Sequence, residues 1–254
     1  MRRLKHLKTN LLFDADMLIY LALQNAEHEI EWSPNFFTLH SDLNEASNFF
    51  ESHVQELIRL VLEHWNIEGE YTIKMAMSDT EGNFRKSLIT EDYKANRKSK
   101  RRPVAFLPMR QWVRDNFDCI EIPNLEADDC VGIHADKNAI MLSGDKDFRS
   151  IPCRFYDFMR NEYYDTTLKE ANYFHLYQTL IGDTVDNYKG CPKVGEVKAK
   201  RILDNEPTWE AVVRAYEANG LTEEDALENA RLAFILRKGY YNKKTKKVKL
   251  WTPS

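Results

Sequence analysis

The sequence predicts an α/β fold in which a mixed, mostly parallel sheet is flanked by helices. Short apolar segments with strand character alternate with segments of helical spacing over the first two thirds of the chain. This alternation is typical of a parallel or mixed sheet that is covered on both faces. From about residue 170 the pattern becomes helical. We therefore expect a core domain over residues 1–170 and a smaller helical region over residues 171–254.

The first part of the chain indicates two strands and one long helix. Apolar residues 11–13 predict a short strand that runs into two aspartates and an apolar helix start. Residues 43–65 carry apolar side chains at near-helical spacing, which predicts a long helix. Residues 71–77 alternate in the manner of a strand and end at Ser78 and Asp79. Residues 80–104 lack a clean period and are rich in charge, so we expect a partly helical excursion outside the core.

The alternation continues through the next fifty residues. A helix is expected over residues 105–116, a strand over 119–122 and a helix that begins at Glu126. Two more strands are expected at 139–142 and near 153–158. Apart from the lysine-rich residues 243–249 there is no low-complexity segment, and there are no internal repeats. The pattern therefore fits one globular core with a helical extension.

Composition limits the class of protein. With 43% hydrophobic and 12% aromatic residues the chain has enough apolar side chains for a packed core. No run approaches the roughly 20 apolar residues of a membrane span, and the apolar stretch after the basic N-terminus breaks at Asp14, unlike a signal peptide. The four cysteines show no CxxC pairing, which favours free thiols in a reducing cytoplasm. We expect a cytoplasmic monomer with no membrane partner.

Charge is strongly segregated although the net charge is only -4. Residues 85–102 hold eight Lys and Arg against two acids, and residues 237–249 hold seven and no acid. Residues 121–147 are the reverse, with seven carboxylates and two lysines. An acidic centre between basic segments suits a polyanion that is held electrostatically while metal ions act at the centre. Solvated charged faces are the alternative interpretation.

Carboxylates follow several predicted strands directly. Asp14 and Asp16 follow the first strand, Asp79 the second, and Asp145 with Asp147 the strand at 139–142. Binding sites in open α/β sheets form outside the carboxyl ends of strands, so we expect these groups to converge. Oxygen ligands without nearby His or Cys favour Mg²⁺ or Mn²⁺. Two ions about 4 Å apart can activate water for phosphodiester hydrolysis. Each aspartate taken singly could instead be a cap or turn residue.

Five segments occur along the chain in the order LLFDAD, MSDTEGNFRKSLITEDYKANRK, LEADD, LSGDKDF and GDTVDNYKGCPKVGEVKAK. In this order they resemble the structure-specific 5′ nucleases, a family that includes flap endonucleases, the 5′-nuclease domain of bacterial DNA polymerase I and short phage exonucleases. Together they span nearly the whole chain and look most like the phage enzymes. The resemblance implies a PIN-like core, a helical arch at about 80–110 and a helix–hairpin–helix element at about 176–203.

The resemblance also implies which residues act. The carboxylates around two or more divalent ions would be those of Asp14, Asp79, Glu126, Asp128, Asp129, Asp145, Asp147, Asp183 and Asp186. Asp16 has no counterpart in the family pattern and is expected to cap the next helix. Lys94 and Arg97 match the family's cationic pair, which stabilises charge on the scissile phosphate. Lys98 is expected to track phosphates, whereas Tyr93 could stack on a base or pack internally.

The segment around residues 190–195 resembles a hairpin that grips duplex phosphates through backbone N–H groups. DNA-binding residues implied there are Gly190, Lys193, Gly195, Lys198 and Lys200. The family's hairpin also holds K⁺, although Lys193 stands where the family usually has glycine. A plain turn between two helices is the alternative for this segment.

The sequence thus predicts a metal-dependent 5′-3′ exonuclease or flap endonuclease that hydrolyses DNA at or near a 5′ end, flap or nick. One alternative is a PIN-like ribonuclease, against which the hairpin and the arch argue. Another is a non-catalytic DNA-binding protein of replication, which should have lost several carboxylates. The sequence leaves open whether exonuclease or endonuclease action predominates and which replication proteins are partners.

Overall fold

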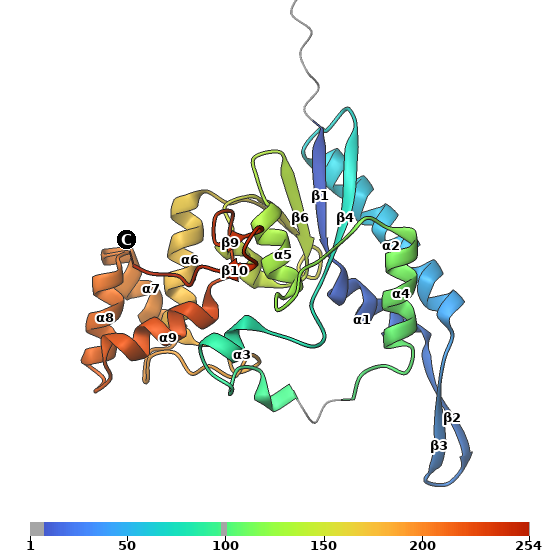
Figure 1. The fold of residues 1–254 in the computed structure, drawn as a ribbon, viewed down its shortest axis with the longest axis horizontal. Helices are drawn as coiled ribbons and strands as arrows, with labels where there is room; N and C mark the ends of the chain where they lie inside the picture. Colours follow the sequence, from blue (N-terminus) through green and yellow to red (C-terminus); the bar gives the residue numbers. More distant parts are fainter. Residues whose placement is uncertain (1–7, 98–100, 254) are drawn as a thin grey trace, which may run out of the picture.

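A central six-stranded sheet organises the protein. A computed structural model describes residues 8–97 and 101–253, and Figure 1 shows the strands at its centre. The strand order is β5-β4-β1-β6-β7-β8, and every neighbouring pair is parallel except β7 with β8. The strands are β1 (Thr9–Asp14), β4 (Tyr71–Met77), β5 (Cys119–Glu121), β6 (Ala139–Ser143), β7 (Arg154–Asp157) and β8 (Glu162–Asp165). The prediction of a mixed, mostly parallel sheet is therefore confirmed.

Helices cover both faces of this sheet. One face packs against α1 (Ala15–Ala26), α2 (Leu43–His64) and α4 (Phe106–Asn116), and the other against α5 (Ala127–His134). Successive side chains of a strand point to opposite faces, so Leu11 and Phe13 lie in the first core and Leu12 in the second. All three are essentially inaccessible to solvent. The buried central strand thus contributes to two cores at once.

The C-terminal part of the chain is helical, as expected. The helices α6 (Leu168–Ile181), α7 (Glu196–Asn205), α8 (Trp209–Glu217) and α9 (Glu223–Ala233) share a separate hydrophobic core. After α9 the chain returns to the sheet, where buried residues 234–236 pack beside α5. It then forms a small hairpin of β9 (Tyr241–Asn242) and β10 (Lys247–Val248). The predicted division at residue 170 falls in the first turn of α6.

The remaining elements differ from the sequence-based expectations. An antiparallel hairpin of β2 (Glu27–Ser33) and β3 (Phe36–Ser41) was not predicted, and it projects from the body in Figure 1. Residues 84–97 contain α3 (Phe84–Leu88) and the short helix η1 (Ala95–Arg97). We expected them outside the core, which is wrong for Arg85 and Tyr93, since only 1% and 2% of these residues are exposed. Within residues 8–97 and 101–253, no helix has the length and apolarity of a membrane span.

Close backbone packing of α5 against the returning chain gives a first prediction. A Cβ added at Gly132 would lie 2.2 Å from the carbonyl oxygen of Leu236. Because backbone cannot easily yield, we expect Gly132→Ala to lower the free energy of unfolding by about 1–3 kcal/mol, as measured by urea denaturation. Gly195→Ala is the control, since a Cβ there meets nothing within 4 Å. Equal losses in the two variants would contradict this packing argument.

Candidate metal centre

The strand-end carboxylates lie along one edge of the sheet. Asp14 is the last residue of β1, Asp79 follows β4 by two residues and Asp145 follows β6 by two. These three strands are parallel neighbours, so their carboxyl ends meet at the same edge. All three side chains line one cleft of about 780 Å³, together with Glu126 and Asp128 from the start of α5. The structure therefore brings together acids that lie up to 131 positions apart, from residue 14 to residue 145.

Asp14 is buried at the floor of this cleft. Its carboxylate accepts hydrogen bonds from the Ser143 hydroxyl at 2.9 Å and from the Met17 N–H at 3.3 Å, so Asp14 caps α1. Burial, and then the charge of Asp16, raise the pKa of Asp14 to about 7. Because this carboxyl group is buried, a negative charge on it is unfavourable unless a nearby cation compensates it.

Asp16 has a different role from the predicted cap. It lies in the first turn of α1, and its carboxylate accepts from the Ser78 N–H at 3.0 Å and from Arg110 at 2.7 Å. Arg110 is 1% exposed and also donates to the carbonyl of Ser78 and to Glu121. The expectation that Asp16 caps α1 is wrong, because Asp14 already accepts the N–H that such a cap would receive. Asp16 instead joins the ends of β1 and β4 to α4.

The loop after β6 supplies two half-buried carboxylates. Asp145 begins the short helix η2 (Lys146–Ser150), and burial raises its pKa above the ordinary value. Burial, and then the charges of Asp145 and Asp183, raise the pKa of Asp147 further. Its Oδ1 atom is buried and accepts no hydrogen bond from any described residue. An orphaned buried carboxylate oxygen costs free energy unless a cation or a donor reaches it.

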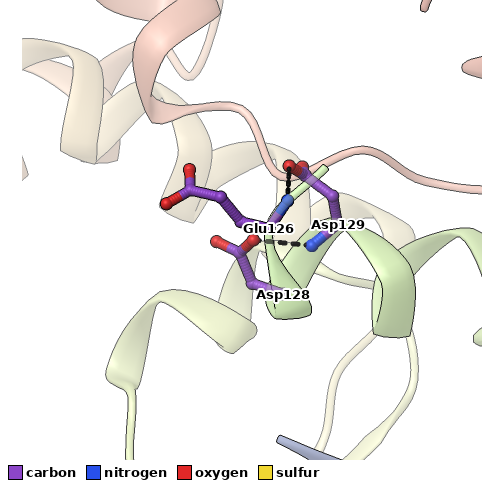
Figure 2. Close-up of side chains that lie close together, drawn as sticks. All are labelled: Glu126, Asp128 and Asp129. Carbon is purple, nitrogen blue, oxygen red and sulfur yellow. Dashed lines mark hydrogen bonds between the residues drawn. The ribbon is translucent and has the colours of Figure 1, made fainter. Parts of the chain in front are cut away.

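Three carboxylates gather at the first turn of α5. One oxygen from each of Glu126, Asp128 and Asp129 lies within 4.8 Å of the others, in a group that could hold a metal ion. Figure 2 shows that the carboxylates of Glu126 and Asp128 extend to one side, whereas that of Asp129 lies against the backbone N–H of Glu126. Burial, and then Asp129 and Glu126, raise the pKa of Asp128 well above its ordinary value. For Glu126, Lys94 and Arg85 outweigh burial and lower the pKa to about 2.

Asp129 is engaged elsewhere, which argues against the predicted role as a metal ligand. The residue is fully buried, and its two oxygens accept from Arg85 at 2.7 and 2.9 Å. One of these oxygens also accepts from the Leu236 N–H at 2.9 Å. Arg85 donates further to the carbonyls of Leu232 and Phe234 and to Glu126. This ion pair thus joins α3, α5 and the returning chain, and it leaves Asp129 little capacity for a metal ion.

The predicted cations reach the same cluster. Lys94 pairs with Glu126 and with Asp186, and Arg97 pairs with Asp186. Lys94 has a left-handed backbone conformation with φ 54°, and its N–H donates to the carbonyl of Asp186. Arg97 is 43% exposed in its side chain, against 16% for Lys94. Both predicted cations therefore line the cleft beside the carboxylates.

Tyr93 is buried beneath this cluster. Its hydroxyl lies within hydrogen-bond distance of Glu126 and Asp186, at 3.0 and 2.9 Å respectively, and can donate its one proton to either carboxylate. In this conformation the ring is not accessible to a base, and the internal-packing alternative fits the observed position. Lys98 lies outside the described residues.

Asp183 and Asp186 lie in the loop between α6 and α7. The Asp183 carboxylate accepts from the N–H groups of Val185 and Asp186, at 2.6 and 3.2 Å, so it holds the turn. Neither residue is among those that line the cleft. Their charges nevertheless contribute to the raised pKa of Asp145 and of Asp147.

The hairpin residues occupy the end of the same loop. Gly190 has φ 65°, and its N–H donates to Asn229, so this amide contributes to internal packing. Lys193 is exposed and has φ 59°, a conformation that favours glycine. Gly195 is the N-cap of α7, and its surroundings are open. Lys200 on α7 is exposed and Lys198 partly exposed. The structure therefore agrees with two helices joined by a turn, whereas phosphate binding remains a prediction.

Two buried arginines were not recognised from the sequence as parts of the site. Arg85 was only one of eight basic residues in a charged segment, and Arg110 had no assigned role. Their partners are distant in the chain: Asp129 lies 44 residues from Arg85, and Asp16 lies 94 residues from Arg110. The one available signal was the position of each arginine among apolar residues at helical spacing, which predicts burial.

The sequence of this chain matches a nuclease family and two phage exonucleases. Residues 32–173 match the family model of the 5′-3′ exonuclease, N-terminal resolvase-like domain. The exodeoxyribonuclease of Enterobacteria phage T3 and the exonuclease of Escherichia phage T7 are each 28% identical, over 96% of this chain and 92% and 93% of theirs.

Among solved structures, a bacteriophage T5 protein co-crystallised with metal ions has a similar fold, with a TM-score of 0.64 and 16% identity over 89% of both chains. A T5 flap endonuclease in complex with DNA and metal ions has a TM-score of 0.59 and 15% identity over 88% of both chains.

Separate roles for neighbouring acids of α5 give a second prediction. Asp129→Asn should lower the free energy of unfolding by about 3–5 kcal/mol, because it leaves the buried Arg85 charge uncompensated. Asp128→Asn, one residue earlier, should leave stability unchanged or raise it, since it removes one of several crowded like charges. Urea denaturation in EDTA measures both. Similar losses in the two variants would contradict this division of roles, because Asp128 would then also support the scaffold.

Proposed function

Because this chain belongs to the 5′-3′ exonuclease family, we propose that it is a divalent-metal-dependent nuclease that hydrolyses DNA phosphodiester bonds at or near 5′ ends. One observation carries the proposal: a single cleft combines carboxylates from the ends of three parallel strands, of which Asp14 is buried and Asp79 and Asp145 are half-buried, with cations from residues 86–110. Acids of this kind bind hard cations, and the facing cations suit a phosphate backbone.

The donor set fits Mg²⁺ or Mn²⁺. The five predicted metal ligands that line the cleft, Asp14, Asp79, Glu126, Asp128 and Asp145, offer only carboxylate oxygen. The orphaned Oδ1 of Asp147 behind them and the raised pKa of Asp14 are both features that a bound cation would relieve. When bound, two such ions activate water and stabilise charge on the leaving oxygen. We assign the ions to Asp14, Asp145 and Asp147 on one side and to Glu126 and Asp128 on the other.

Asp79 supports the cleft from β4. Its carboxylate accepts from the N–H groups of Asn124 and Glu81, at 2.7 and 2.9 Å. These backbone donors outweigh burial and lower its pKa, so Asp79 is negatively charged in the proposed active state. In our proposal it binds ions through its remaining coordination capacity and fixes the turn that leads into α5.

Lys94 and Arg97 are proposed to stabilise the negative charge that develops on the scissile phosphate. The support is that both extend into the carboxylate cluster, where a phosphate bridged to the ions would lie. Acidic partners outweigh burial and raise the pKa of Lys94, so it carries its charge. A cation held partly buried and prepositioned in this way needs little reorganisation during reaction.

DNA is proposed to extend from the cleft to the start of α7. The free N–H groups at this helix N-terminus and the side chains of Lys193, Lys198 and Lys200 would contact duplex phosphates. The fold similarity to a T5 flap endonuclease crystallised with DNA and metal ions is consistent with this path. We further propose that the protein acts as a monomer in the cytoplasm, that a 5′ end, flap or nick is its substrate, and that K⁺ binds at the hairpin.

Polarity and metal dependence are tested together by product mapping. Duplex, nicked and flap DNA labelled at either end are incubated with the protein in Mg²⁺ or in EDTA. The 5′ label should appear first in short products, only with Mg²⁺, and the 3′ label should shorten late. Early mononucleotide release from the 3′ end would contradict the assigned polarity. Binding without any cleavage would indicate an accessory protein, and cleavage of RNA alone would indicate a ribonuclease.

The metal assignment is tested by substitution. Asp145→Asn should lower the single-turnover cleavage rate at least about 100-fold, while DNA affinity stays equal or increases because a negative charge near phosphate is lost. Asp115→Asn, an exposed aspartate on α4, is the matched control and should cleave normally. Normal cleavage by Asp145→Asn would exclude this carboxylate from the metal centre.

A further inference from the structure

A second cationic surface lies outside the catalytic cleft. It is the lysine hairpin, residues 239–249, in which β9 and β10 are joined by a four-residue turn. Its five lysines are all exposed: Lys243, Lys244, Lys246, Lys247 and Lys249. None of these five lysines lines the carboxylate cleft. The hairpin therefore concentrates positive charge at a place that the catalytic proposal does not use.

The hairpin is a built element of the fold. Asn242 accepts from the N–H groups of Lys244 and Thr245, at 2.9 and 3.1 Å, which closes the turn. Lys246 has φ 55°, a conformation usual for glycine or asparagine, so a lysine here is held at a backbone cost. On the inner side Tyr241 and Val248 pack against the core that contains α5. The turn thus presents its lysines from a fixed support.

These lysines lack acidic partners. From residue 237 to the C-terminus the sequence contains no Asp or Glu. Across residues 8–97 and 101–253, none of the five forms an ion pair with a carboxylate. Many other surface cations do, such as Arg59 with Glu56 and Arg114 with Glu121. Five uncompensated cations on a chain of net charge -4 mark a surface suited to a polyanion.

The lysine hairpin and the carboxylates of the cleft lie at opposite ends of α5. Lys243 lies 3.3 Å from the ring of His134, at the C-terminal end of α5, whereas Glu126 and Asp128 lie at its N-terminal end. A helix of eight residues is about 12 Å long. Figure 1 shows β9 and β10 beside α5. The lysines are therefore about one helix length from the carboxylates, a separation that a DNA duplex covers in roughly four base pairs at 3.4 Å each.

We infer that the lysine hairpin binds backbone phosphates of a duplex arm of the same DNA molecule whose 5′ end occupies the cleft. This inference rests on the proposed nuclease function. Lysines on flexible stems act as point charges that follow phosphates without selecting a sequence. The two tyrosines of the hairpin, Tyr240 and Tyr241, pack against the core that contains α5 and are only partly exposed, which favours duplex over single-stranded DNA on this surface. Its contribution depends on the length of the arm.

The test compares two double variants, each of which loses two positive charges. The hairpin variant is Lys246→Asn with Lys247→Gln, where asparagine suits the left-handed turn position. The control variant is Arg59→Gln with Arg114→Gln, which removes two cations from the opposite face of the sheet. Affinity is measured by fluorescence anisotropy in EDTA on a junction with two arms of about 20 base pairs. Two further, shortened junctions each lack one of the two arms, so that no duplex reaches the hairpin from that side.

On the full junction the hairpin variant should bind roughly 5- to 10-fold more weakly than wild type, and its salt slope should fall by about 1–2 units. On one of the two shortened junctions it should match wild type, which identifies the arm. The control variant should match wild type on the full junction. An unchanged affinity for the full junction would overturn the inference and point to an acidic protein as partner. Equal weakening on all three junctions would also overturn it.

Failure of the proposed function has a separate signature. Wild type is incubated with the same junctions in Mg²⁺, and cleavage there tests the nuclease directly. Absence of cleavage would refute the nuclease proposal even if the binding differences were found. Normal wild-type cleavage together with unchanged binding by the hairpin variant would refute only the inference about the lysine hairpin.

Discussion

The geometry of the metal centre depends on the buried guanidinium of Arg85. It contacts two carboxylates, Asp129 and Glu126, and two main-chain carbonyls near residue 233. Three segments distant in the chain are held by this one group: α3, the start of α5 and the segment that returns after α9. A buried charge of this kind is tolerated only when its partners are complete, so each segment constrains the other two. Glu126 and Asp128 are consequently fixed at the rim of the cleft before any ion binds.

Charge compensation divides the cleft into two parts. On one side Lys94, Arg85 and Arg97 already neutralise Glu126 and Asp186. On the other side burial raises the pKa of Asp14 although its carboxylate accepts hydrogen bonds, and burial also raises the pKa of Asp145 and of Asp147. Cation binding would therefore relieve the unfavourable charge at the ends of β1 and β6, and also that of Asp128 on α5, whose pKa is likewise raised by burial. At the α5 side an incoming ion competes with protein cations, and these become available to phosphate.

Local patterns in the sequence were sufficient to predict the sheet and the edge at which the strand-end carboxylates meet. They did not predict the burial of charged residues whose ion-pair partners are distant in the chain. The strand at residues 71–77 was predicted at its observed bounds, because its alternation and the following acid are local signals. The burial of Arg85 was missed, since a charged segment is expected in solvent and its partner is 44 residues away. The hairpin of β2 and β3 was missed because Glu alternates there with exposed apolar residues, so neither face has the character of a core strand.

Net charge is a poor guide to function for such a chain, and the arrangement of charges explains why. The carboxylates that make the total negative gather at one end of three strands and of α5, where cations bound as proposed would cancel their charge locally. Uncompensated lysines lie at the opposite end of α5, and basic residues also line the rim of the cleft. The electrostatic field of a charged side chain extends over roughly 8–10 Å at physiological ionic strength. DNA at the cleft or at the lysine hairpin therefore responds to the nearby charges and not to the net charge of the chain. Metal-dependent catalysis at a carboxylate cluster and the binding of a polyanion can therefore coexist on one small protein. The condition is that a rigid helix keeps the carboxylates and the lysines about one Debye length apart.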